Sequence, residues 1–318
     1  MLEVGASSEP ATITAPKTRG TGDAVINVEQ ARRDIVAAAP DVVGIGNSMM
    51  FTRLGKSPVE LSALSGKKFF FLYKNGSDAP IWYLALKNII AESGARPKAI
   101  LLFVRDNELT AEFSSENEGA APYLTSLRSP EEPELDNFMQ KSGNHPTSML
   151  GLWFTFPTLQ EKASSRLTDL ALDLGGGGTA KKAMRFMLTE RFGLDHLRQD
   201  LGSEFKSKDS NVPDVAGVER SLLPHILGVT KRIGAKLIVF RIKRRPDATT
   251  QLPPEPAAMR AYSESMGRWL KEHGAVWFDE TYDEQIKLSD YLDGDHISPA
   301  RMEWYRSYFW QRTKELFP

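Results

Sequence analysis

A serine and a histidine far apart in the chain have the residue types of a nucleophile and its base. Ser48 follows a short apolar segment that ends at Gly46, and His296 closes an Asp-Gly-Asp-His turn. A serine hydroxyl attacks an acyl carbon only when a base removes its proton. An aspartate three residues before the histidine can reach back and accept the imidazole N–H. Ser48 is therefore a candidate nucleophile, His296 a candidate base, and Asp293 a candidate for the residue that orients His296.

Each of these residues also has an ordinary structural interpretation. A serine after a strand often caps the next helix, and a histidine in a polar turn is often a surface residue. Asp295 is a second candidate partner for His296, but side chains of adjacent residues diverge. The remaining histidines are His145, His196, His225 and His273. Their spacing is not that of a metal site, so we expect neither a metal nor another cofactor.

The candidate residues follow segments with the pattern of buried β-strands. The short apolar segments expected as strands are 41–46, 67–73, 98–104, 236–242 and 276–278. The amphipathic segments expected as helices are 28–38, 79–93, 218–233, 256–273 and the residues after Ser298. The alternation predicts an α/β three-layer sandwich with a central, mostly parallel five-stranded sheet. Such folds bind ligands beyond the carboxyl ends of the strands, which is where Ser48 stands.

Two regions depart from this alternation. Residues 108–213 show no buried strand, and we expect a largely helical insertion or lid there, with helices over 150–173 and 179–192. The acidic stretch 107–134 has the pattern of a loop. Residues 1–26 are small and polar, cannot bury enough apolar surface to order themselves, and are expected to form a flexible arm.

The composition excludes several classes of protein. Hydrophobic residues make up 41% and charged residues 25% of the 318 residues, as in an ordinary globular domain, which we place at residues 27–318. The net charge of -1 argues against nucleic acid as the main partner. The absence of cysteine excludes disulfides, thiolate zinc sites and a cysteine nucleophile. No apolar run reaches about 18 residues, so we expect no transmembrane segment.

The N-terminus also lacks the pattern of a signal peptide. This leaves the location of the protein undetermined. We expect a periplasmic location if an N-terminal anchor has been removed from the chain, and a cytoplasmic one otherwise.

Two motifs together resemble those of the SGNH, or GDSL-like, serine hydrolase superfamily. The segment Val42–Ser48 matches its first block, a strand followed by Gly-Asp-Ser, with Asn47 in place of the aspartate. The segment Asp293–Pro299 matches its last block, Asp-x-x-His before the final helix. The resemblance covers roughly residues 40–110 and 215–318 and implies the flavodoxin-like fold of that superfamily.

The resemblance also implies roles for the loops after the second and third predicted strands. Gly76 stands where the superfamily has an oxyanion glycine, and Asn107 is the candidate oxyanion asparagine. Asp106 is an alternative to Asn107 at that place. Arg105 and Asp106 are also candidates for the rim of the substrate site.

The function implied is that of a serine-dependent ester hydrolase acting through an acyl-Ser48 intermediate. Short acyl esters, including those of carbohydrates, are the expected substrates. One alternative is a polysaccharide O-acetyltransferase that uses the same three residues, a branch in which the Gly-Asn-Ser-Met variant also occurs. A second alternative is a non-catalytic glycan-binding module with the same fold. A dinucleotide site is disfavoured because Met49 takes the place of the third glycine of its motif.

Overall fold

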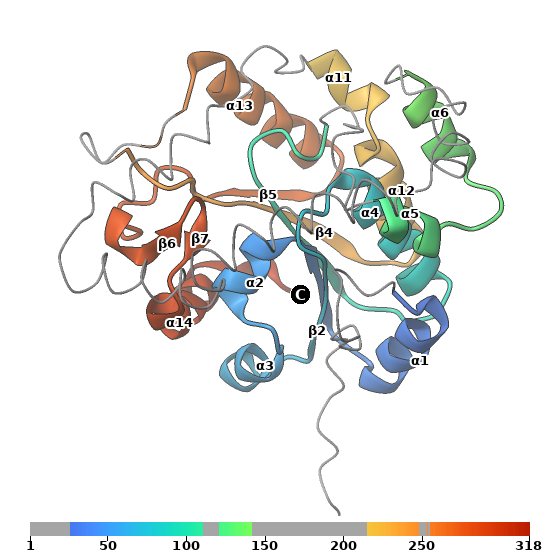
Figure 1. Cartoon of the computed structure of the whole chain (residues 1–318), viewed down its shortest axis with the longest axis horizontal. Helices are drawn as coiled ribbons and strands as arrows, with labels where there is room; N and C mark the ends of the chain where they lie inside the picture. The colour runs from blue at the N-terminus through green and yellow to red at the C-terminus, as the bar shows by residue number, and fades with distance from the viewer. Residues whose placement is uncertain (1–25, 111–120, 142–214, 248–252, 254) are drawn as a thin grey trace, which may run out of the picture. The chain divides into compact units, whose positions relative to one another are not determined.

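Five parallel strands form the centre of the structure (Figure 1). The computed structural model describes residues 26–110, 121–141, 215–247, 253 and 255–318. The strands are β1 (Val42–Gly46), β2 (Phe69–Tyr73), β3 (Ala99–Val104), β4 (Lys236–Arg241) and β5 (Val276–Asp279). They pair in the order β2-β1-β3-β4-β5, and every pair is parallel. This is the flavodoxin-like strand order, and it confirms the predicted α/β fold.

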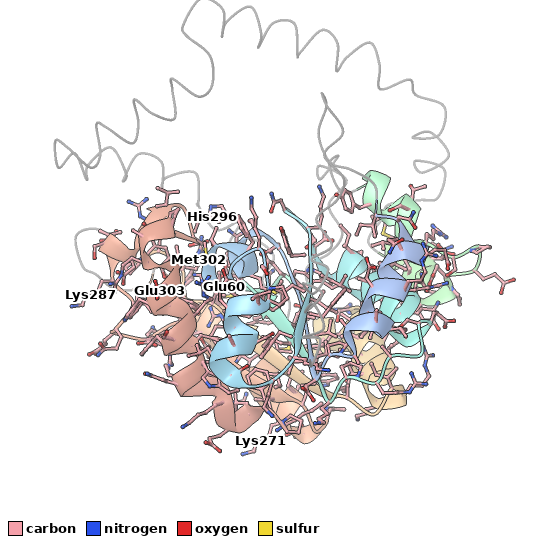
Figure 2. The ribbon with its side chains drawn as sticks, turned by 90° about the horizontal axis from the view of Figure 1, so that it is seen from below. Glu60, Lys271, Lys287, His296, Met302 and Glu303 are labelled. Carbon is pink, nitrogen blue, oxygen red and sulfur yellow. The ribbon has the colours of Figure 1, made fainter. Side chains whose placement is uncertain are left out.

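Helices cover both faces of this sheet, which makes three layers (Figure 1). The helices on one face are α2 (Ser48–Leu54), α3 (Val59–Ser65) and α14 (Met302–Thr313). In Figure 2, Glu60 marks α3 and Met302 marks the start of α14. Those on the other face are α1 (Val28–Ala38), α4 (Ala79–Leu84), α12 (Leu223–Arg232) and α13 (Ala257–Glu272). The sheet and these helices belong to one compact unit.

Alternate residues of each strand face the helices on one side, as the two-residue period of a strand requires. Leu101, Phe103 and Phe240 lie on the side of α14 and are at most 1% exposed. The ring of Phe240 stacks on those of Phe103 and Phe278, with centroids 4.8 and 4.9 Å apart. Phe309 of α14 closes this aromatic layer, with its ring centroid 5.2 Å from that of Phe240. Burial of these large rings stabilises the sheet on which the candidate residues stand.

The structure differs from the expected elements in several places. The helix expected over 79–93 is α4 followed by a π-helix, η1 (Ala85–Ala91). The helix expected over 218–233 is two helices, α11 (Val215–Arg220) and α12, because Pro224 begins a new helix in the first turn of α12. The helix expected directly after Ser298 begins with a 3-10 turn, η6 (Pro299–Arg301), before α14, and the side chain of Ser298, at the N-cap of that turn, makes no capping hydrogen bond.

The acidic stretch 107–134 contains a helix that the loop prediction missed. This helix, α5 (Ala121–Leu127), is followed by α6 (Pro133–Lys141). Leu124 and Leu127 are at most 2% exposed, and the side-chain amide of Asn88 donates to the carbonyl of Leu127 at 2.7 Å. The short apolar pattern of α5 is hidden in the sequence by the charged residues on both sides. Residues 1–25 and the helices expected over 150–173 and 179–192 lie outside the described residues.

Candidate active site

Ser48 lies at the carboxyl end of β1, where the chain turns into helix α2. Asn47 is the N-cap of that helix, and its side-chain oxygen accepts a hydrogen bond from the N–H of Met49 at 3.1 Å. The turn is tight, because a Cβ on Gly46 would lie 2.9 Å from the Cβ of Met50. The strand, the glycine and the cap together place Ser48 as the first residue of α2 at this edge of the sheet.

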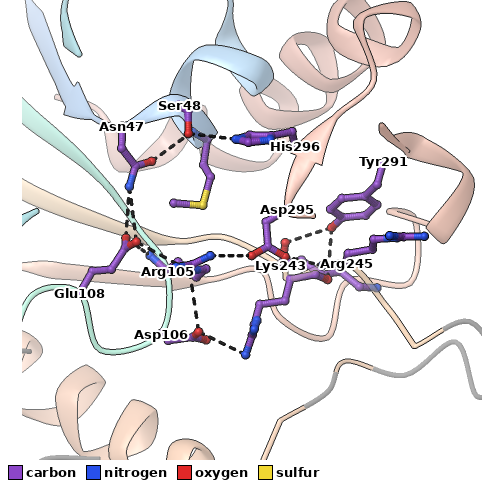
Figure 3. Close-up of polar contacts among 12 residues, drawn as sticks. Asn47, Ser48, Arg105, Asp106, Glu108, Lys243, Arg245, Tyr291, Asp295 and His296 are labelled. Carbon is purple, nitrogen blue, oxygen red and sulfur yellow. Dashed lines mark hydrogen bonds and ion pairs between the residues drawn. The ribbon is translucent and has the colours of Figure 1, made fainter. Parts of the chain in front are cut away.

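His296 is brought to Ser48 by a short hairpin. Strands β6 (Tyr291–Asp293) and β7 (His296–Ile297) form it, and Gly294 in the turn has a φ of 39°, a conformation that favours glycine. The Oγ of Ser48 lies 2.9 Å from Nε2 of His296 (Figure 3). This is a hydrogen-bonding distance between a serine hydroxyl and a base, and it joins residues 248 positions apart.

The third residue expected at the site, Asp293, stands at the end of β6. The backbone register pairs position 293 with His296 across the hairpin. The side chain of Asp293 lies outside the part of the chain that the structure describes. Its role in orienting the imidazole of His296 therefore stays a prediction.

Asp295, the alternative partner of His296, has other contacts. Its carboxylate accepts hydrogen bonds from the backbone N–H of Arg245 at 2.8 Å and from Nη1 of Arg105 at 3.1 Å (Figure 3). Its backbone carbonyl accepts a hydrogen bond from Nη1 of Arg53 at 2.8 Å. These contacts hold the hairpin rather than the imidazole ring.

A partly buried carboxylate next to the serine loop, that of Glu108, was not among the predicted site residues. Glu108 accepts hydrogen bonds from the backbone N–H of Arg105 at 2.8 Å and from the side-chain amide of Asn47 at 3.4 Å (Figure 3). Burial raises the pKa of Glu108 to about 7, although the charge of Arg105 opposes the rise. The sequence signal for this residue is its place directly after Asn107, in the loop that follows β3.

Arg105 and Asp106, which we expected at the substrate rim, take part in ion pairs. The carboxylate of Asp106 lies 3.4 Å from Nη1 of Arg244 and 3.7 Å from Nη2 of Arg241. Burial raises the pKa of Asp106, and the neighbouring arginines oppose the rise. Figure 3 shows Asp106 on the far side of Arg105 from Ser48. A role for Arg105 and Asp106 in substrate binding stays a prediction.

The loops of Gly76 and Asn107 both adjoin the serine loop. Gly76 has a φ of 69° in the turn after β2, and the next residue, Ser77, donates from its hydroxyl to the carbonyl of Gly46 at 3.0 Å. The side-chain amide of Asn47 donates to the carbonyl of Ser77 at 3.4 Å and also reaches the residue that follows Asn107. The structure thus brings the three loops together, while oxyanion binding by Gly76 and Asn107 stays a prediction.

The pair formed by Ser48 and His296 has the groups needed for nucleophilic acyl transfer. When the hydroxyl of Ser48 donates to Nε2 of His296, the proton of the neutral imidazole is on Nδ1. His296 can then accept the hydroxyl proton as Ser48 attacks a carbonyl carbon. In the described part of the chain, no group of three or more His, Cys, Asp or Glu residues could hold a metal ion. Within those same residues, no helix is long and apolar enough to cross a membrane.

Comparisons with known proteins give similarities to solved structures at low sequence identity. A candidate acylhydrolase of Bacteroides fragilis is 8% identical, with a TM-score of 0.43 over 92% of this chain and 98% of that chain. A GDSL-like lipase of Bacteroides thetaiotaomicron is 7% identical, with a TM-score of 0.41 over 91% of this chain and 98% of that chain. No protein-family model matches the sequence, and no curated protein matches it.

Proposed function

We propose that this protein is a serine-dependent ester hydrolase that works through an acyl-Ser48 intermediate. The observation that carries the proposal is the distance of 2.9 Å between Oγ of Ser48 and Nε2 of His296. A serine in an ordinary helix cap needs no imidazole partner. The two residues also stand in the two motifs that resemble those of SGNH hydrolases, and those motifs support ester hydrolysis as the reaction.

The first half of the reaction forms the acyl-enzyme. Nε2 of His296 takes the hydroxyl proton while Oγ of Ser48 bonds to the carbonyl carbon of the ester. The carbonyl oxygen becomes an oxyanion, for which we assign the backbone N–H of Gly76 and the side-chain amide of Asn107 as donors. When the oxyanion collapses, the bond to the alcohol oxygen breaks and His296 returns the proton to that oxygen.

The second half of the reaction releases the acid. A water molecule gives one proton to His296 and attacks the acyl carbon, and Ser48 leaves with the proton that the imidazole returns. Both halves need an imidazole held in one tautomer. We assign Asp293 to accept a hydrogen bond from Nδ1–H of His296, because opposite residues of a hairpin lie close enough to interact.

The substrates we propose are short acyl esters, including acetyl esters of carbohydrates. This choice rests on the resemblance of the two motifs to those of SGNH hydrolases. A sugar hydroxyl in place of water in the second half would make the protein an acyltransferase with the same Ser48 chemistry.

A fluorophosphonate probe tests the mechanism, because the probe phosphorus bonds to an activated serine oxygen as fluoride leaves. We expect the wild-type protein to be labelled at Ser48 and Ser48→Ala to take no label. We expect His296→Ala to lower the turnover of p-nitrophenyl acetate by about 10²–10⁴-fold, the usual contribution of a general base. Ser57→Ala, in the loop after α2, is the matched control and keeps wild-type labelling.

Two results would redirect or overturn the proposal. Acyl-enzyme that accumulates until a sugar acceptor is added would identify a transferase. A folded wild-type protein that takes no label, or a Ser48→Ala variant with full turnover, would rule out the acyl-serine mechanism and favour a binding module.

A further inference from the structure

Arg105 lies between the two parts of the chain that carry the candidate catalytic pair. Its Nη1 donates to Asp295 at 3.1 Å, and its Nε lies 3.7 Å from the carboxylate of Glu108 (Figure 3). Both acids are largely buried, with side-chain exposures of 4% for Asp295 and 18% for Glu108. A single guanidinium thus contacts two carboxylates, one buried and one partly buried, from elements far apart in the sequence.

The contact of Arg105 with Asp295 lies next to the candidate base, His296. Asp295 is the residue before His296, and its other carboxylate oxygen accepts the N–H of Arg245 at 2.8 Å. Its backbone carbonyl accepts Nη1 of Arg53, which is fully buried. The guanidinium of Arg105 therefore holds the residue next to the imidazole, in a hairpin whose pairing is only a few residues long.

The contact of Arg105 with Glu108 is linked to the candidate nucleophile, Ser48, through Asn47. Glu108 accepts the amide of Asn47 at 3.4 Å, and the same asparagine caps α2 through the N–H of Met49. Ser48 lies between Asn47 and Met49 and is the first residue of α2. Glu108 thus holds the side chain of Asn47, the residue before Ser48, through one hydrogen bond.

We propose that Arg105 is a positioning residue, whose guanidinium bridges Glu108 and Asp295 and so keeps Ser48 and His296 at hydrogen-bonding distance. The inference rests on the proposed function, because it concerns the geometry of that reaction. Without the guanidinium, Glu108 and Asp295 lose the cation that holds them on either side of it. The planar fork of arginine can contact both carboxylates in fixed directions, whereas the ammonium of lysine is a point charge.

The experiment measures kcat and KM for p-nitrophenyl acetate, fluorophosphonate labelling and the melting temperature. The variants are Arg105→Ala, Arg105→Lys and Arg128→Ala. Arg128 is the matched control: its side chain is 27% exposed, against 29% for Arg105, and it pairs with Asp136 away from the site. We expect Arg105→Ala to lower kcat by about 10–100-fold with little change in KM, since small misplacements of reacting groups have effects of this size.

Two further results are expected if the role of Arg105 is positional. Added methylguanidinium should restore part of the kcat of Arg105→Ala, because the side chain is accessible enough for a small cation to enter. Arg105→Lys should have an intermediate kcat and a melting temperature close to that of wild type, which keeps the test valid if Arg105→Ala does not fold. Arg128→Ala should match wild type in kcat and labelling.

The inference is overturned if Arg105→Ala or Arg105→Lys has the kcat and labelling rate of wild type. It is also overturned if the loss of activity resists methylguanidinium and only follows a fall in melting temperature, which would indicate a purely structural residue. A wild-type protein that takes no label would remove both the proposed function and this inference. Normal wild-type labelling with unaffected Arg105 variants would remove this inference alone.

Discussion

Glu108→Gln is expected to stabilise the protein, and to do so more at high pH. Burial raises the pKa of Glu108 from 4.5 to about 7, so the charged form is less favourable in the folded state than in the unfolded state. The wild-type protein therefore loses stability as the pH rises from the unfolded pKa through the folded one. At about 1.4 kcal/mol for each pKa unit, the full effect is about 3 kcal/mol. Glutamine removes the charge and keeps an oxygen that can accept the N–H of Arg105 and the amide of Asn47.

Urea unfolding at pH 5 and pH 8 measures this effect. We expect the free energy of unfolding of Glu108→Gln, relative to wild type, to increase by about 2–3 kcal/mol from pH 5 to pH 8. Glu29→Gln is the control, because the side chain of Glu29 on α1 is 69% exposed and the change of residue type is the same. Two results would refute the reasoning. One is a difference in the free energy of unfolding between Glu108→Gln and wild type that is the same at both pH values. The other is a change with pH no larger than that of Glu29→Gln.

Three further predictions concern packing around the site and the core, each measured by urea unfolding. Gly46→Ala should lower stability by about 1–3 kcal/mol and slow the labelling of Ser48, because the new Cβ would lie 2.9 Å from the Cβ of Met50 and displace α2. Equal labelling rates for Gly46→Ala and wild type would contradict this. Gly228→Ala in α12, where no heavy atom lies within 4 Å of the new Cβ, should instead raise stability by about 0.5–1 kcal/mol. Phe240→Ala should lower stability by about 3–5 kcal/mol through the cavity left in the aromatic layer, and a loss below about 1 kcal/mol would show that the layer repacks.

The sheet could be predicted from the sequence because its strands are short runs with few polar residues. All five expected strands are present, and none of their ends differs by more than two residues from the expected position. Parallel strands that are buried on both faces have nearly continuous hydrophobic sequences, which makes them easy to identify. The π-helix η1 left no such signal, since its apolar residues also fit an ordinary helix, and its hydrogen-bond pattern is set by packing.

The candidate site was predicted only in part, for a physical reason. Ser48 and His296 stand in two local motifs, and the resemblance of these motifs to those of SGNH hydrolases indicated both residues. The bridge from Glu108 through Arg105 to Asp295 joins acids that come together only in the folded chain, with Arg105 and Asp295 190 positions apart. Nothing in the local sequence of Arg105 distinguishes a bridging guanidinium from a solvated one.

The distance in sequence between Ser48 and His296 has a consequence for how the protein becomes reactive during synthesis. The ribosome adds roughly 5–20 residues each second, so the residues between them take roughly 10–50 s to appear. During that interval β1 and α2 can form, but α2 lacks β7 and α14, against which it packs. A nascent chain therefore holds an unactivated serine, and labelling of Ser48 would report that the last elements of the chain have folded.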